Sequence, residues 1–76
     1  MNKARRTRLA TILETTEELA AALREVIEDE EDANENLPES IQGTDRGETA
    51  SGTIDILNEA LELLEQAKDY IQEGSE

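Results

Sequence analysis

The chain has 76 residues and a mass of 8.4 kDa, enough for one small domain with a marginal core. It contains no Cys and no His, which excludes disulfides, thiol nucleophiles, His-based acid–base catalysis and Cys/His zinc sites. Its 20 acidic and 7 basic residues give a net charge of −13, so we expect it to repel nucleic acids and anionic membranes. No apolar run reaches the roughly 18 residues of a membrane span, and the first six residues lead into no secretory segment, so we expect a cytoplasmic protein.

The first predicted element is a helix from about residue 3 to about residue 32. Its apolar positions follow one another in steps of three and four, the spacing of a helix with one buried face. The row that we expect to face the core is Leu9, Ile12, Thr16, Leu19, Leu23 and Val26. Leu13, Ala20 and Ile27 are expected beside this row, where they widen it.

A loop is predicted over residues 33–47, because turn and cap residues replace the helix formers there. Pro38 disfavours helical backbone at Leu37, so the first helix must end before it. The segment 38–42 can form a short helical turn that Gly43 closes.

The second helix is predicted over about residues 48–72, with about Thr44 as the alternative start and residues 73–76 as a tail. Its core-facing positions also follow steps of three and four, except that Lys68 replaces an apolar residue: Ala50, Ile54, Leu57, Leu61, Leu64 and Ile71. Gly47, Ser51, Gly52 and Thr53 are poor helix formers, so we expect an irregular start.

A second apolar row on this helix consists of Ile56, Leu63 and Tyr70, which are spaced by seven. The two rows together are too wide for one partner helix to cover. Either a short third helix formed by the segment 38–42 covers the outer row with Leu37 and Ile41, or the chain self-associates. We favour self-association, so the expected fold is all-α: one domain over residues 1–76, an antiparallel helical hairpin that assembles into a helical bundle.

The charges of the first helix oppose its dipole, because bases crowd its beginning and five acids, residues 28–32, crowd its end. One explanation is charge balance within the hairpin. If opposite residue numbers sum to about 80, Glu73 and Glu76 lie near the arginines. The other explanation is a functional site that contains the arginines.

No sequence motif supports catalysis or metal binding. Residues 32–36 resemble the start of an EF-hand loop, but Leu37 stands where the loop needs Gly and Gly43 where it needs Glu. Closely spaced carboxylates without a pocket or a metal do not make an active site. We therefore expect no enzyme, no metal and no cofactor.

The segment 42–48 is a candidate anion site, because Gly43 and Gly47 flank Arg46 and the start of a helix can receive an anion. The competing interpretation is that Arg46 binds no ligand and pairs with the acids of the first helix. Within one antiparallel hairpin, Arg5 lies roughly 40 Å from Arg46 at 1.5 Å per residue. Two antiparallel hairpins remove this difficulty, and the predicted ligand-binding residues are then Arg5 and Arg6 of one copy with Gln42 and Arg46 of the other.

Several of these segments together resemble small acidic helical proteins of bacteriophages and prophages, a group without an established activity. The resemblance rests on Asn2, Arg5-Arg6, the acidic run 28–31, Asn36-Leu37-Pro38-Glu39, Gln42 and residues 45–48 before an Ile/Leu helix. It covers most of the chain, and its most specific part runs from Asn36 to Glu48. The sequence departs from the group at Gly43, Ser51, Gly52 and Thr53, where the group has helix formers.

The resemblance implies a phage setting, a bacterial host cell and an accessory, counter-defence role. The first functional hypothesis is an oligomeric bundle that sequesters a small anionic ligand, such as a signalling nucleotide. The second is an acidic decoy that imitates nucleic acid and binds a basic host protein. The third is a structural or regulatory interaction module.

Overall fold

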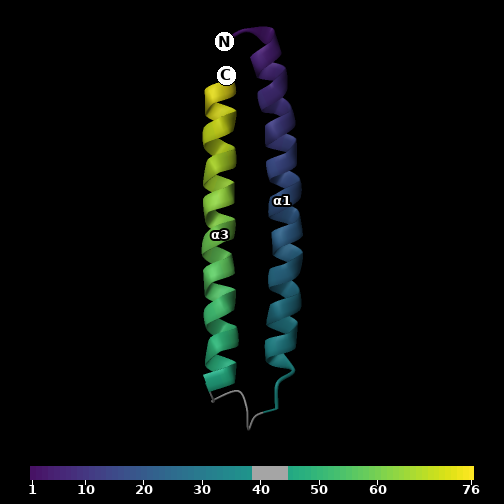
Figure 1. The fold of residues 1–76 in the computed structure, drawn as a ribbon, viewed down its shortest axis with the longest axis vertical. Helices are drawn as coiled ribbons and strands as arrows, with labels where there is room; N and C mark the ends of the chain where they lie inside the picture. Colours follow the sequence, from purple (N-terminus) through teal and green to yellow (C-terminus); the bar gives the residue numbers. More distant parts are fainter. Residues whose placement is uncertain (39–44) are drawn as a thin grey trace.

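The computed structural model describes residues 1–38 and 45–76, which form two long helices and no strand (Figure 1). Helix α1 runs from Lys3 to Glu35, and helix α3 runs from Asp45 to Ser75. The two helices lie antiparallel, with both chain termini at the same end of a rod that measures 59 × 15 × 12 Å. The expected all-α helical hairpin is therefore confirmed.

Both helices are longer than the sequence pattern predicted. Asn2 caps the start of α1, because its side-chain oxygen Oδ1 accepts a hydrogen bond from the backbone N–H of Arg5 at 2.9 Å. At the other end the backbone N–H of Asn36 donates to the carbonyl of Asp32, which extends α1 three residues past the predicted end. The helix stops just before Leu37 and Pro38, as the restriction that proline imposes requires.

The expectation of an irregular start to the second helix is wrong. Helix α3 begins at Asp45 and includes Gly47, Ser51, Gly52 and Thr53. A low intrinsic helix propensity costs about 1 kcal/mol at each Gly, and a long helix that packs along a partner can absorb this cost. The predicted short turn at 38–42 lies almost wholly outside the described residues.

The contact between the helices uses a different row of α1 from the one predicted. Along α1 the side chains turned toward α3 are Leu9, Leu13, Thr16, Ala20, Leu23 and Ile27. Ala20 is 2% exposed and Ile27 is 4% exposed, whereas Ile12, Leu19 and Val26 are all about half exposed. The rows 12/19/26 and 13/20/27 are one residue apart and have the same period. With the second row turned inward, the small side chain of Ala20 is buried in the contact with α3.

The contact row of α3 is the predicted one from Ile54 onward, and the side chain of Ala50 lies outside the described side chains. Its half-buried members are Ile54, Leu57, Leu61, Leu64, Lys68 and Ile71. Lys68 is half-buried at its seam position, which a long cationic side chain tolerates because its aliphatic stem can be buried while its ammonium group stays in water. Below, these six residues and the six of α1 are called the seam.

We predict that Ile27→Ala destabilises the hairpin strongly and that Val26→Ala does so weakly. Ile27 is buried in the seam, and truncating a buried Ile costs about 2–5 kcal/mol. Val26 is its chain neighbour and is half exposed, so the matched truncation should cost less than half as much. Urea unfolding of the two variants at low protein concentration measures both losses. A larger loss for Val26→Ala would show that the row 12/19/26 faces α3.

Candidate functional site: an apolar face with a basic end

Two contacts between the helices help to assign the sequence positions of each helix to one side of the hairpin or the other. The guanidinium of Arg24 pairs with the carboxylate of Glu65, and the Asn34 amide donates to the Ser51 hydroxyl at 3.4 Å. Arg24 follows the seam residue Leu23, and Glu65 follows the seam residue Leu64. Because the helices are antiparallel, positions that directly follow a seam residue lie on one side of the hairpin in both helices. Positions that directly precede a seam residue therefore lie on the opposite side.

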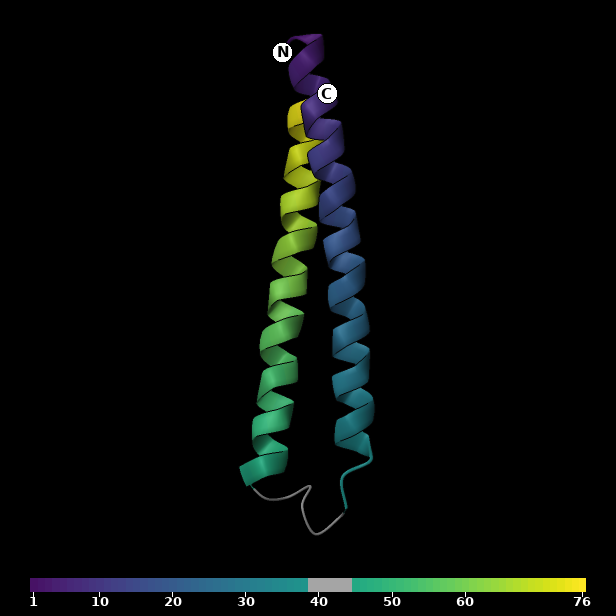
Figure 2. The same cartoon turned by 45° about the vertical axis from the view of Figure 1, so that its right-hand side comes forward.

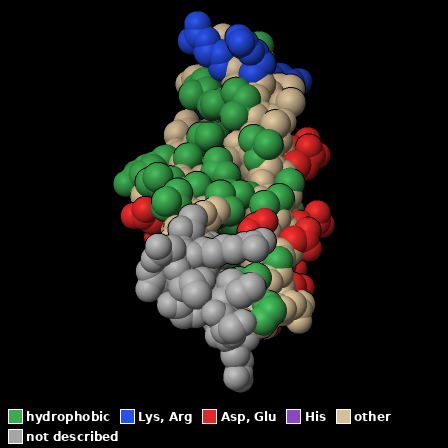
Figure 3. Space-filling view, turned by 60° about the horizontal axis from the view of Figure 1, so that its bottom comes forward, with side chains coloured by type: hydrophobic (Ala, Val, Ile, Leu, Met, Phe, Trp, Pro, Cys, Tyr) green, Lys and Arg blue, Asp and Glu red, His purple; other side chains and the backbone are tan. Residues whose placement is uncertain are grey.

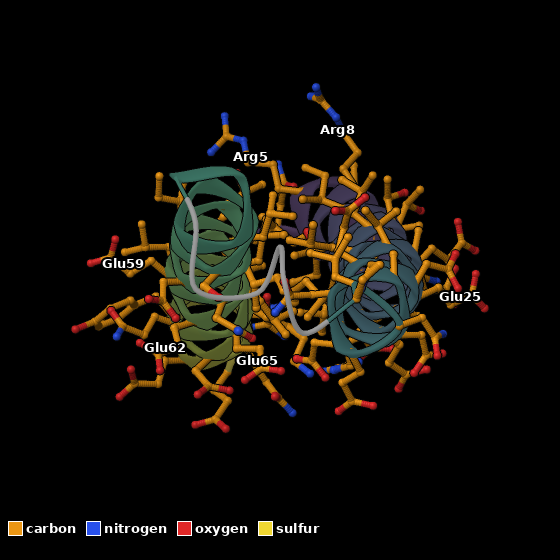
Figure 4. The ribbon with its side chains drawn as sticks, turned by 90° about the horizontal axis from the view of Figure 1, so that it is seen from below. Arg5, Arg8, Glu25, Glu59, Glu62 and Glu65 are labelled. Atoms are coloured by element: carbon orange, nitrogen blue, oxygen red, sulfur yellow. The ribbon has the colours of Figure 1, made fainter. Side chains whose placement is uncertain are left out.

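The side that follows the seam is acidic. Of its twelve positions seven are Asp or Glu, and we call it the acidic face: Ala10, Glu14, Glu17, Ala21, Arg24, Glu28, Asp55, Asn58, Glu62, Glu65, Asp69 and Gln72. In Figure 4, which looks along the hairpin, Glu62 and Glu65 point toward this side, and Arg5 and Arg8 point toward the other.

The side that precedes the seam carries no acid at any of its twelve positions. We call it the apolar face: Arg8, Ile12, Thr15, Leu19, Ala22, Val26, Thr53, Ile56, Ala60, Leu63, Ala67 and Tyr70. Figure 3 shows hydrophobic side chains spread over both helices on this face, with acidic side chains along its edges and basic ones at its far end. The six largest apolar side chains on it are between 47% and 72% exposed.

The basic end of the hairpin extends beyond α3. The two contacts above join residues whose numbers sum to 89 and 85 rather than the predicted 80. Glu76 is therefore level with about residues 9–13 of α1, and Lys3 to Arg8 project past the end of α3 (Figure 2). This register does not set Glu73 and Glu76 opposite the arginines, and within the described residues no acid forms an ion pair with Arg5, Arg6 or Arg8.

A shallow, open depression of about 290 Å³ lies where the basic end meets the apolar face. It is lined by Met1, Arg5, Arg8, Leu9 and Ile12. Arg5 and Arg8 therefore share a surface with apolar side chains. Arg6, one residue further along the helix, is turned by about 100° toward the acidic face. Of the predicted ligand-binding residues, Arg5 alone lines this depression.

The remaining predicted site residues are far from this end of the chain. The backbone of Arg46 lies in the first turn of α3, at the opposite end of the rod from Arg5. The side chain of Arg46 lies outside the side chains that the structure describes, and Gln42 lies outside the described residues. Within one copy, Arg5 and Arg46 of the predicted ligand-binding residues are therefore far apart, in agreement with the separation expected for a single antiparallel hairpin.

Sequence reasoning placed Ile56, Leu63 and Tyr70 on an outer row but missed the matching row on α1. Ile12, Leu19 and Val26 were assigned to the seam. The charges at the two ends of the row 12/19/26 were the signal that could have indicated its position outside the seam. Arg8 continues the row 12/19/26 one turn toward the N-terminus and Glu30 continues it one turn toward the loop, so both ends of this row are charged.

No protein family, curated protein or solved structure matches this chain. Among the described residues, no group of three or more acidic side chains is arranged to hold a metal ion. No helix of the described chain is long and apolar enough to cross a membrane.

We predict that Arg5→Glu stabilises α1 on its own while removing a base from the site. The first turn of α1 holds no acid, and Glu at residue 5 stands three positions after the Asn2 cap, where it favours the helix dipole. The expected gain is about 0.5–1 kcal/mol in the free energy of unfolding. Urea unfolding at low protein concentration measures it. A loss of stability would mean that Arg5 supports the fold of the single hairpin.

Proposed function

We propose that this chain is a non-enzymatic interaction protein that works through its apolar face, joining copies into a helical bundle. The observation that carries the proposal is the size of the core. Among the side chains described in residues 1–38 and 51–76, Ala20 and Ile27 are the only buried apolar ones. The radius of gyration is 17.4 Å, against about 11 Å for a compact domain of this length.

The separation of charge supports the same proposal. A chain of net charge −13 repels copies of itself unless the contacting surfaces are free of acids. The apolar face has no acid at any of its twelve positions, whereas the acidic face has seven. Exposed apolar area of this continuity marks an interaction surface on a soluble protein. Two such faces packed together form the closed core of a four-helix bundle, which one hairpin lacks.

A second candidate function, the sequestration of a small anion, is favoured by the depression that Arg5 and Arg8 share with Leu9 and Ile12. Two guanidinium groups suit phosphate oxygens, and the apolar wall suits the flat part of a nucleotide. A complete site with Gln42 and Arg46 requires a second copy. The proposals of an acidic decoy for a basic host protein and of a phage counter-defence role remain predictions from the sequence.

For the first function we predict that Leu63→Glu lowers the assembly state. Leu63 is 65% exposed at the middle of the apolar face, so a charge there leaves the seam intact and opposes burial of the face. Asn58→Glu is the matched control, because it adds the same charge to the same helix on the acidic face. Native mass spectra of the three proteins measure the subunit number. Equal subunit numbers in Leu63→Glu and wild type would contradict the proposal.

For the second function we predict that Arg5→Ala/Arg8→Ala abolishes binding of a phosphate-containing probe. The probe is inorganic pyrophosphate, followed by chemical-shift changes of the backbone amides. Lys3→Ala/Arg24→Ala removes the same charge from residues that do not line the depression, so it separates a local site from the general field. Similar weakening by both double variants, or no binding to wild type, would reject the anion site.

A further inference from the structure

We infer that the apolar face is covered by a second copy of the chain that lies antiparallel to the first. The basic end of each copy then meets the acidic loop end of the other. This inference rests on the proposed self-association and adds its orientation. Two orientations are open to two hairpins packed face to face. In the parallel one, α1 lies against the partner's α3. In the antiparallel one, α1 lies against the partner's α1 and α3 against the partner's α3.

The outer row of α1 favours the antiparallel orientation. Ile12 and Val26 are each seven residues from Leu19, so a twofold axis at Leu19 sets Ile12 of one copy against Val26 of the other. Arg8 lies eleven residues before Leu19 and Glu30 lies eleven residues after it. The same axis therefore places Arg8 of each copy opposite Glu30 of its partner. At equal distances on either side of Leu19 the apolar side chains are therefore similar, whereas the charged side chains at the two ends of the row have opposite signs.

The outer row of α3 is compatible with this axis. Ile56 and Tyr70 are each seven residues from Leu63, and the two interhelical contacts place Leu63 level with about residues 22–26 of α1. The centres of the two rows are thus about five residues apart along the rod. A shared axis between them, from residue 19 to about residue 24 of α1, brings Arg8 level with a residue between 30 and about 40 of the partner. That stretch contains Glu30, Glu31, Asp32 and Glu35.

Charge also opposes the parallel orientation. It would place both basic ends together, each projecting past its own α3 without an acid in the described chain to pair with. It would also place both runs of acids at residues 28–32 side by side. Like charges held together cost free energy, whereas the antiparallel orientation pairs every basic end with an acidic one. It also relieves the reversed charges of α1, since each helix end gains a partner of the opposite sign.

Spin labels measure the orientation directly, because the chain has no native cysteine. Thr7→Cys puts a nitroxide at the basic end, outside the apolar face. In the antiparallel dimer the two labels lie about 24–34 residues apart along the rod, about 35–50 Å at 1.5 Å per residue. In the parallel dimer they lie level across the bundle, within about 25 Å given interaxial distances of about 8–10 Å. Pulsed electron double resonance reports this distance.

Ala21→Cys is the control label, since it lies near the middle of α1 on the acidic face and is close to its counterpart in either orientation. A short distance at Ala21 with a long one at Thr7 supports the inference. Short distances at both positions overturn it while leaving self-association in place. No intermolecular distance at either position means that the proposed self-association itself fails, and the face then takes another partner.

A charge exchange gives an independent readout. Arg8→Glu and Glu30→Arg should each weaken self-association by at least about two-fold, because each dimer loses two opposed pairs. The combined variant should regain wild-type association. Lys3→Glu and Glu25→Arg are the matched controls, since Glu25 points away from the apolar face (Figure 4). Additive weakening in the combined variant would overturn the antiparallel pairing of these residues.

Discussion

The controlling constraint on this protein is that two helices lying side by side bury only one stripe of each. The seam meets this limit, and within the described side chains it yields two buried apolar residues, Ala20 and Ile27. The side chain of Ala20 is a single methyl group and contributes little apolar area. A hairpin of this kind gains its helical hydrogen bonds locally and gains little from a core. The proposed assembly follows from this shortfall, because the remaining apolar side chains lie together on one face.

Charge is distributed so that this face can be buried. The acids lie on the opposite face, on the outer flanks and at the loop end, and the bases are concentrated in the first residues of α1. A uniform spread of the same residues would have put carboxylates among Leu19, Leu63 and their neighbours. The bases oppose the dipole of α1, a local cost that the single hairpin does not recover. In the proposed antiparallel dimer the same bases meet acids, so the cost is recovered between copies.

Much of this fold follows from the sequence in physical terms. Apolar spacing of three and four gives two helices, Pro38 ends the first, and the spacing on α3 gives both its seam and its outer row. The rotation of α1 did not follow, because the rows 12/19/26 and 13/20/27 have the same period and similar side chains. Periodicity alone cannot choose between them. The structure chooses through packing at Ala20 and through the contacts of Arg24 and Asn34.

The register of the hairpin, meaning which residues of α1 lie level with which residues of α3, was the second quantity that the sequence left open. The observed register changed which residues make up the candidate site. A shift of five to nine in the sum of opposed residue numbers moved the arginines past the end of α3 and away from Glu73 and Glu76. The candidate site then became Arg5 and Arg8 with the apolar residues beside them, while Arg6 turned away. The predicted loop spans residues 33–47, too many residues for its sequence to determine which positions of the two helices lie level.

Sedimentation equilibrium of the unmodified chain, from low micromolar to millimolar concentration, tests the central claim most directly. The account predicts a reversible rise from the 8.4 kDa of one chain to twice that mass. It also predicts that the association tightens with added salt, because the overall repulsion between two copies of charge −13 is screened while the apolar contact is not. A mass of one chain at every concentration and salt would contradict the account, and the apolar face would then require a different partner.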